Sequence, residues 1–354
     1  MRTMKASRIF GPSDMRLVDV PVPEVGPREV LCKVVRAGVC GTDYAIYTGA
    51  FSFVKNGAIK FPMTPGHEWS GIVEKIGSEV TNFKVGDRVV SDTGVACGEC
   101  YDCLVGTGYR CKHGRAVGTI KCWDGAYGEY ILMPQRHLFH LPDNVSFDQG
   151  AFLEPSGIAL GSVRSADVQA GDTVLVHGTG PIGILAATLA RICGASKVAI
   201  TGRKGFKLDI ARKMGVDATI NTTKEPLREA ARNLVGPDGF DRIIEASGSI
   251  ELFRQSFDLV KAGGTISVVA FYEKLMDQFD IDKLVFGIVT VRGSAGLSSV
   301  NRPVLNLMAE GRLDPTPLIT SRRPLFEAAK AMTDMRDHND TRVKILMEGP
   351  GYES

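Results

Sequence analysis

The chain has 354 residues, which exceeds the usual size of a single hydrophobic core and favours two domains. Hydrophobic residues make up 44% and charged residues 23%, as in a soluble globular protein. The formal net charge is only +2, and the sequence has no block of like charges and no apolar run that could span a bilayer, which argues against nucleic-acid and membrane partners. Because no secretory signal is present, we expect a cytoplasmic protein with reduced thiols.

The first part of the chain, from Val30 to about Leu141, consists of short strand-like runs. Examples are Val30–Val35 and Gly71–Ile76, which are bounded by Gly, Pro and Asp turns. This pattern predicts a β-barrel-like domain.

Within that part, a mixed set of metal-binding side chains is spread along the sequence. Cys40 is followed by the pair His67 and Glu68, and later by Glu154. One thiolate, one imidazole and one or two carboxylates can hold zinc and leave a position for substrate, which is a catalytic composition. Taken singly, each residue is ambiguous, because a lone Cys is more often a small core side chain and a lone His beside Glu a turn residue.

Four cysteines form a second, tighter cluster in a loop-like stretch, with the spacing Cys-x2-Cys-x2-Cys-x7-Cys. Four thiolates around one zinc ion leave no open position, so the spacing predicts a structural metal site. Ordinary buried thiols, two disulfides and an iron-sulfur cluster are the alternatives. The cysteines are Cys97, Cys100, Cys103 and Cys111.

Beyond Gly171 the pattern changes to alternating strands and helices, which predicts a doubly wound parallel sheet of six strands. The expected helices include Pro181–Ile192 and Phe206–Met214. The expected strands are Thr173–His177, Lys197–Thr201, Ala218–Asn221, Arg242–Ala246, Thr265–Ala270 and Thr290–Gly293.

A Gly-x-Gly-x-x-Gly turn follows the first of these strands and opens the first helix, which is the context of a dinucleotide site. Its first glycine makes the turn, its second lets the backbone approach a pyrophosphate, and its third permits close packing of helix and strand. A purely structural turn is the alternative. The residues are Gly178, Thr179, Gly180, Pro181, Ile182 and Gly183.

The position that normally carries an acidic ribose anchor, at the end of the second strand, is Gly202. Arg203 and Lys204 follow it and could pair with a 2′-phosphate. The sequence therefore favours NADP over NAD. If the two cations are only a solvated loop pair, NAD would bind without its usual anchor.

The tail from about Ser294 is interrupted by prolines and does not continue the alternation. We expect it to return to the first domain. The predicted organisation is a domain over 1–155, completed by 294–354, and a dinucleotide-binding domain over 156–293.

These features together resemble the zinc-dependent medium-chain alcohol and polyol dehydrogenases, over essentially the whole length. The resemblance implies a GroES-like catalytic domain, a Rossmann cofactor domain and an active site in the cleft between them. Some relatives carry a second Cys ligand at position 154. The Glu154 of this chain is similar to the carboxylate that the sorbitol and threonine dehydrogenase branches have there. The matching segments are Val39-Cys40-Gly41-Thr42-Asp43, Pro65-Gly66-His67-Glu68, Val85-Gly86-Asp87-Arg88-Val89, the four-cysteine lobe, Gly125-Ala126-Tyr127-Gly128-Glu129-Tyr130, Glu154-Pro155 and the glycine turn.

By this resemblance, Cys40, His67 and Glu154 surround a catalytic zinc, and Glu68 is an alternate ligand. It also implies that Thr42 accepts the alcohol proton. Many relatives finish the proton relay with a His five residues after the zinc Cys, and this chain has Ala45 there. The resemblance thus implies two zinc ions per chain, one catalytic and one structural, with the relay route left open.

The expected substrate is a small alcohol or its ketone, with a polyol, sugar alcohol or cyclitol as first choice. Threonine-like amino alcohols and simple alcohols or aldehydes are the alternatives. From a different class, a non-catalytic redox sensor that binds zinc and NADPH also remains open. The resemblance implies a homodimer or homotetramer.

Overall fold

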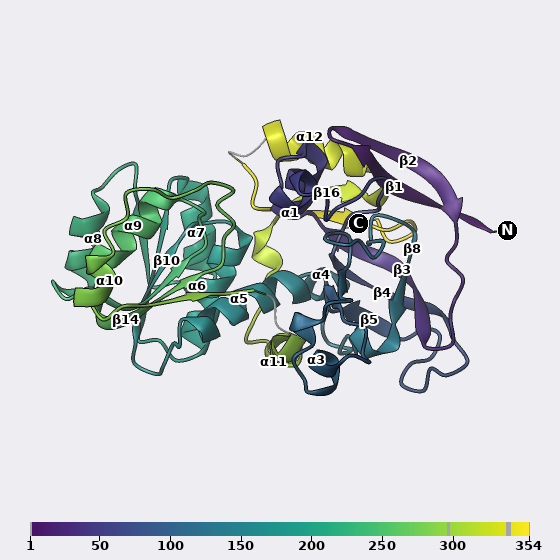
Figure 1. Cartoon of the computed structure of the whole chain (residues 1–354), viewed down its shortest axis with the longest axis horizontal. Helices are drawn as coiled ribbons and strands as arrows, with labels where there is room; N and C mark the ends of the chain where they lie inside the picture. The colour runs from purple at the N-terminus through teal and green to yellow at the C-terminus, as the bar shows by residue number, and fades with distance from the viewer. Residues whose placement is uncertain (1, 296–297, 338–340, 354) are drawn as a thin grey trace. The chain divides into compact units, whose positions relative to one another are not determined.

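The computed structural model describes residues 2–295, 298–337 and 341–353 (Figure 1). The chain forms two compact units. The first comprises Met1–Glu154, Asn301–Ala309 and Ile319–Ser354, and the second comprises Pro155–Val300 and Glu310–Leu318. Pro155, residues 294–295 and 298–300, and the segment Glu310–Leu318, all of which we expected in the first domain, thus lie with the second unit. No described helix has the length and apolar character needed to cross a membrane.

The first unit is built around a seven-stranded sheet with the order β16-β17-β3-β4-β5-β9, in which β8 also pairs with β3. All its pairings are antiparallel except that of β16 with β17. Its core includes Val34, Trp69 and Ile345. The strands are β3 (Glu29–Gly38), β4 (Glu68–Ile76), β5 (Arg88–Ser91), β8 (Tyr130–Pro134), β9 (Leu138–His140), β16 (Ile319–Pro324) and β17 (Lys344–Glu348).

Two small hairpin-like sheets and short helices complete this unit. The small sheets pair β1 (Thr3–Gly11) with β2 (Asp14–Pro21), and β6 (Gly94–Val95) with β7 (Arg115–Ala116). The helices are α1 (Gly41–Thr48), α2 (Ser52–Lys55), α3 (Tyr101–Leu104), α4 (Phe147–Gly150), α11 (Asn301–Ala309) and α12 (Ala328–Asp337).

The second unit contains a six-stranded, fully parallel sheet with the order β12-β11-β10-β13-β14-β15. The strand order reverses between β10 and β13, as in a doubly wound dinucleotide-binding fold, which confirms the predicted fold class. The strands are β10 (Thr173–His177), β11 (Lys197–Gly202), β12 (Ala218–Asn221), β13 (Phe240–Glu245), β14 (Val260–Val268) and β15 (Thr290–Gly293). The helices are α5 (Leu153–Ser165), α6 (Pro181–Ile192), α7 (Gly205–Lys213), α8 (Leu227–Val235), α9 (Ile250–Leu259) and α10 (Asp282–Phe286).

Candidate metal and cofactor sites

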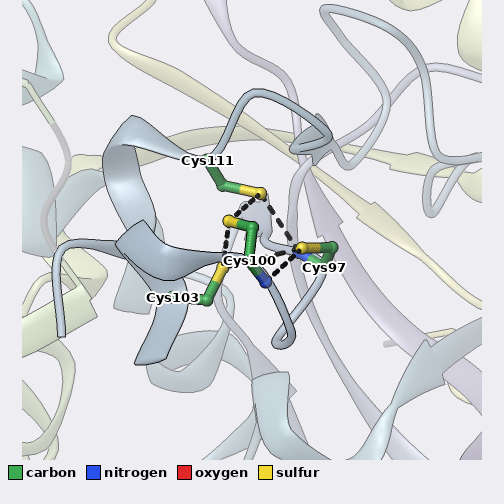
Figure 2. A group of neighbouring side chains, drawn as sticks. All are labelled: Cys97, Cys100, Cys103 and Cys111. Atoms are coloured by element: carbon green, nitrogen blue, oxygen red, sulfur yellow. Dashed lines mark hydrogen bonds between the residues drawn. The ribbon is translucent and has the colours of Figure 1, made fainter. Parts of the chain in front are cut away.

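The four cysteines of the loop-like stretch come together in space (Figure 2). The Sγ atom of Cys100 lies 3.5 Å from that of Cys103 and 3.7 Å from that of Cys111, and Cys97 Sγ lies 3.8 Å from Cys103 Sγ. Four sulfurs around one zinc ion are about 3.8 Å apart, because each Zn–S bond is about 2.3 Å long. The cluster therefore has the dimensions of a zinc site, and all eight cysteines of the chain are free thiols.

Backbone amides stabilise the thiolate form within this cluster. The amide of Cys100 donates to Cys97 Sγ at 3.4 Å, and the amide of Cys97 donates to Cys111 Sγ at 3.4 Å. Hydrogen bonds from the backbone of Glu99 and Cys100 lower the pKa of Cys97 to about 6. A thiolate is the form that binds a metal. His113, which lies in the same loop, is not part of the group.

A second group consists of Cys40, His67 and Glu68, whose ligand atoms lie within 4.8 Å of one another. Cys40 directly precedes α1, while His67 and Glu68 stand at the start of β4. His67 and Glu68 are buried and Cys40 is partly exposed. The structure thus brings together a thiol, an imidazole and a carboxylate from segments 27 residues apart in sequence.

Asp43, which is completely buried, holds this group in place. Its Oδ2 accepts a hydrogen bond from the amide of Cys40 at 2.9 Å and one from the hydroxyl of Tyr127 at 2.9 Å. Its Oδ1 accepts from the amide of Gly66 at 3.3 Å and lies 3.4 Å from His67 Nδ1. One carboxylate therefore fixes the backbone at Cys40 and beside His67, and it faces the imidazole from the side on which a metal-binding His has its acceptor.

The surroundings of His67 favour a positive charge. Burial lowers its pKa, but the negative charges of Asp43 and Cys40 raise it more, and the net pKa lies well above the ordinary value of 6.5. Surroundings that hold a proton on an imidazole also favour a metal cation. The donor set and its charge therefore fit a zinc ion.

Glu68 is held by a lysine from the far end of the sequence. Lys344 Nζ donates to both carboxylate oxygens of Glu68 at 2.7 Å each, and to the carbonyl of Val39 at 3.2 Å. The side chain of Lys344 is 3% exposed and that of Glu68 is 2% exposed. Glu68 therefore forms a buried, bidentate ion pair beside Cys40.

Glu154 does not join the group of Cys40, His67 and Glu68. It stands in the first turn of α5 and is partly exposed. Desolvation raises the pKa of Glu154 to about 7. The positive charge of His67 lowers this pKa in part, and the negative charge of Glu68 raises it further. Its carboxyl group is thus in the electrostatic field of the cluster.

Two other residues of α1 differ in their surroundings. Thr42 lies in the first turn and is partly exposed, as a residue that contacts substrate must be. Ala45 packs instead against the apolar cluster of Ile46, Phe51 and Met63. Position 45 therefore supplies no proton-transfer group. Phe51, which belongs to the same apolar cluster, is a buried core residue.

In the second unit, the glycine turn between β10 and α6 has the shape expected of a phosphate cradle. Gly178 has φ of +104°, and a Cβ atom on Gly183 would lie 1.9 Å from the carbonyl oxygen of Gly178. A Cβ on Gly180 would meet no atom within 4 Å. Pro181 opens α6, so this glycine turn lies at the N-terminus of a helix, where an anion such as a dinucleotide phosphate is favoured. Ile182 follows it and is partly exposed.

The end of β11 has no room for a side chain at Gly202 unless Thr179 shifts. A Cβ on Gly202 would lie 2.5 Å from Cγ2 and 2.7 Å from Oγ1 of Thr179. Arg203 and Lys204, which follow, are exposed. His177, at the end of β10, is completely buried, and its Nδ1 lies 3.0 Å from Thr201 Oγ1, so it packs within the sheet.

Lys344 and Tyr127 are functional candidates that the sequence reasoning did not identify. Lys344 opens β17 and lies in the otherwise apolar run Val343-Lys344-Ile345-Leu346-Met347, and a cation in such a run is a signal for a buried partner. Tyr127 lies in one of the matching segments. Its buried ring comes within 2.3 Å of where a Cβ on Gly66 would be, so Gly66 has to be glycine.

Two models of known families match the chain. The alcohol dehydrogenase GroES-like domain matches residues 26–143 and the zinc-binding dehydrogenase domain matches residues 181–310. The chain is 35% identical to an L-threonine 3-dehydrogenase of Rhizobium etli over 92% of this chain and 93% of that protein. It is 38% identical to one from Deinococcus deserti over 86% and 87% of the respective lengths.

Solved structures are similar over nearly the whole chain. An NADP-bound Sinorhizobium meliloti protein, assigned to the zinc-binding dehydrogenases, has a TM-score of 0.90 and 33% identity, covering 98% of this chain and 100% of that one. The 2R,3R-butanediol dehydrogenase of Bacillus subtilis has a TM-score of 0.88 and 29% identity, covering 98% and 99%. The chain belongs to the zinc-dependent medium-chain alcohol dehydrogenase family and is an oxidoreductase that acts on alcohols.

Proposed function

We propose that the chain interconverts a secondary alcohol of a polyol, sugar alcohol or cyclitol with its ketone, and uses NADP(H) as cofactor. The observation that carries this proposal is the group of Cys40, His67 and Glu68 on a frame fixed by Asp43. A binding protein without catalysis has no need of such an open metal site.

For the catalytic zinc, we propose Cys40, His67 and Glu154 as ligands and Glu68 as an alternate ligand. Lys344 donates to both oxygens of Glu68 and so already compensates the charge of that carboxylate. This pairing supports Glu154 as the third ligand. The cluster of Cys97, Cys100, Cys103 and Cys111 would hold a second, structural zinc.

The residues of the first unit then have defined tasks. A zinc ion held there supplies Lewis acidity, which lowers the pKa of a bound alcohol. Thr42 would accept the alcohol proton through its hydroxyl, and a bound nicotinamide would supply the hydride acceptor. Because Ala45 cannot carry the proton onward, the proton would have to leave by another group, such as the cofactor ribose, water or Glu68.

NADP is the proposed cofactor, in preference to NAD. Gly202 leaves no carboxylate to repel a 2′-phosphate, and Arg203 and Lys204 place two exposed cations directly after it. The Sinorhizobium meliloti relative was solved with bound NADP, which supports the same choice.

Oxidation of a threonine-like amino alcohol is the second candidate, because the chain is 34% to 38% identical to several L-threonine 3-dehydrogenases. Structural similarity to butanediol and galactitol-1-phosphate dehydrogenases supports the polyol instead. Threonine, butanediol and sugar alcohols share a secondary alcohol beside a carbon that bears a polar group.

A substrate panel distinguishes these candidates. Absorbance at 340 nm is followed with NADP+ and inositols, hexitols, 2,3-butanediol, L-threonine or short primary alcohols. We expect the highest kcat/KM with an inositol or hexitol. Threonine as the best substrate would favour the second candidate, and turnover of primary alcohols alone would refute both.

We further propose that the chain forms a homodimer or homotetramer. Every residue of the edge strand β15 is exposed, and Phe286 and Ile288 nearby are 83% and 75% exposed. An uncovered edge strand with apolar neighbours favours pairing with another chain. Light scattering at micromolar concentration should give at least twice the mass of 38.1 kDa, and a monomer would contradict the proposal.

A further inference from the structure

Glu245 is a completely buried carboxylate at the end of β13 whose partners are all uncharged. Its Oε1 accepts hydrogen bonds from the amide of Ser247 at 2.9 Å and from the hydroxyl of Ser247. Its Oε2 accepts from the amide of Gly248 at 3.2 Å and from the hydroxyl of Tyr272 at 2.5 Å. Burying a carboxylate is costly because the charge loses its hydration, and an apolar side chain would avoid that cost. The carboxylate of Glu245 must therefore have a role that an apolar side chain could not fill, namely its hydrogen bonds to the neighbouring loops.

Glu245 forms hydrogen bonds with two loops at the carboxyl edge of the parallel sheet. Ser247 and Gly248 belong to the loop after β13, and Tyr272 belongs to the loop after β14. The hydroxyl of Ser247 also accepts from the amide of Ser249, which caps α9. One side chain thus links both loops and the start of a helix.

The same loop packs directly on the glycine turn. A Cβ on Gly178 would lie 3.0 Å from the backbone of Ala246 and Ser247, and the amide of Ala246 donates to the carbonyl of His177 at 3.0 Å. A Cβ on Gly248 would lie 2.9 Å from the carbonyl oxygen of Phe271. The loop after β13 therefore lies in contact with the turn on one side and with the loop after β14 on the other.

The topology of the sheet indicates which part of a dinucleotide these loops meet. In a doubly wound sheet, the dinucleotide lies across the carboxyl ends of the strands, with its pyrophosphate at the first glycine turn. Gly202 and Arg203 place the adenosine half over β11 and β12. The nicotinamide half then lies on the opposite side of the glycine turn, over β13 and β14, where Glu245 fixes the loops.

We propose that Glu245 is a positioning residue for the nicotinamide half of the dinucleotide. This role rests on the proposed NADP-dependent function. Glu245 acts through the backbone of 246–248 and through Tyr272, and it does not itself contact the cofactor. Its loss should weaken the binding of a complete dinucleotide and leave the binding of an adenosine fragment unchanged.

Calorimetric titration of the full-length protein with NADP+ and with 2′,5′-ADP, which lacks the nicotinamide half, tests this role. In Glu245→Gln, one carboxylate acceptor becomes an amide donor that faces N–H and O–H groups. We expect the Kd for NADP+ to rise by about tenfold or more and the Kd for 2′,5′-ADP to stay within about twofold. Tyr272→Phe removes a single hydrogen bond. It should raise the Kd for NADP+ by a smaller factor than Glu245→Gln does and leave the Kd for 2′,5′-ADP unchanged. The control is Glu251→Gln, an exposed carboxylate on α9, which should change neither value.

An equal loss for both ligands in Glu245→Gln would show a general structural role and overturn the proposal. Unchanged affinity for NADP+ in both Glu245→Gln and Tyr272→Phe would also overturn it. If Glu245→Gln does not fold, Tyr272→Phe decides between the same outcomes. If the unaltered protein binds neither ligand, the dinucleotide site itself is refuted, and the positioning role with it.

Discussion

Lys344 on β17 and Glu68 on β4 form a buried ion pair in which one ammonium group donates to both carboxylate oxygens at 2.7 Å. The two residues are 276 positions apart in sequence. The pair joins the C-terminal strand to the proposed metal centre and neutralises one of its carboxylates.

Breaking this pair should be costly. Lys344→Met leaves a buried carboxylate without its cation, and we expect the free energy of unfolding to fall by about 3–5 kcal/mol in urea. Adding Glu68→Gln removes the unpaired charge and should recover part of the loss. The exposed pair of Lys5 and Asp19 provides the control, since Lys5→Met should cost less than about 1 kcal/mol. Additive effects of Lys344→Met and Glu68→Gln would contradict the pairing.

Asp43 should control metal affinity at the proposed catalytic site. Asp43→Asn removes the charge behind His67 and one of the acceptors for Cys40, Gly66 and Tyr127. We expect zinc to bind this site about 10- to 100-fold more weakly in a chelator competition. Asp19→Asn, at an exposed carboxylate, should leave the affinity unchanged. Unaltered zinc binding in Asp43→Asn would mean that Asp43 does not orient a ligand.

The four-cysteine cluster should contribute to stability and not to hydride transfer. Cys100→Ser should lower the zinc content measured by mass spectrometry from about two to about one per chain. Because the lobe around residues 97–111 loses its metal, limited proteolysis should cut there first. Cys193→Ser, at an exposed thiol outside both clusters, should keep both ions. Loss of catalysis with an intact lobe would contradict this assignment.

Acid should weaken an ion-pair network in the first unit. Asp148 Oδ1 lies 2.6 Å from Arg36 Nε, and Asp148 Oδ2 lies 2.5 Å from Arg322 Nη2. Burial raises the pKa of Asp148, but the hydrogen bonds from Arg322 and Arg36 lower it more, so the net pKa lies below its ordinary value. The unfolded chain therefore takes up a proton at Asp148 before the folded chain does. The stabilisation is complete above about pH 4 and is lost as the pH falls through the folded pKa.

Asp148→Asn tests this pH dependence. At pH 7 the variant should be about 1–3 kcal/mol less stable than the unaltered protein. The difference should begin to shrink below about pH 4 and should vanish once the pH is below the folded pKa, because Asp148 is then protonated in both states. A difference that grows toward low pH would have the wrong sign and would refute the network's role.

Arg203 should determine the preference for NADP. Arg203→Ala should raise the KM for NADP+ by about tenfold or more and leave the KM for NAD+ nearly unchanged, because only NADP+ carries the 2′-phosphate. The control is Arg212→Ala on the exposed side of α7, where Arg212 pairs with Asp209. If the unaltered protein has a higher kcat/KM with NAD+ than with NADP+, the role of Gly202 and Arg203 is refuted.

Local patterns predicted the second unit closely. The strands Thr173–His177, Ala218–Asn221 and Thr290–Gly293 and the helix Pro181–Ile192 begin and end at the predicted residues. Some of these limits are encoded locally, by the apolar run Thr173–His177 that ends at the glycine turn and by Pro181 at the first position of its helix. The predicted doubly wound sheet follows from this alternation.

Contacts between distant segments could not be predicted in the same way. Lys344 reaches Glu68 only because β17 pairs with β3, which also pairs with β4. Glu245 binds Tyr272 only because β13 and β14 are adjacent. Each of these charged residues adjoins apolar residues of a buried strand, which signals a buried charge but does not identify its partner.

The centre at Cys40 and His67 should act as the catalytic metal site of an NADP-dependent dehydrogenase. This role is tested by the rate of NADPH formation at 340 nm, with a secondary-alcohol substrate, as zinc is added back to metal-free protein. Activity should rise only as the second zinc per chain binds, and Cys40→Ser should abolish it. Full activity with one zinc per chain, or no activity on any secondary alcohol with two, would show that this centre is not catalytic, and the latter result would favour a non-catalytic redox sensor.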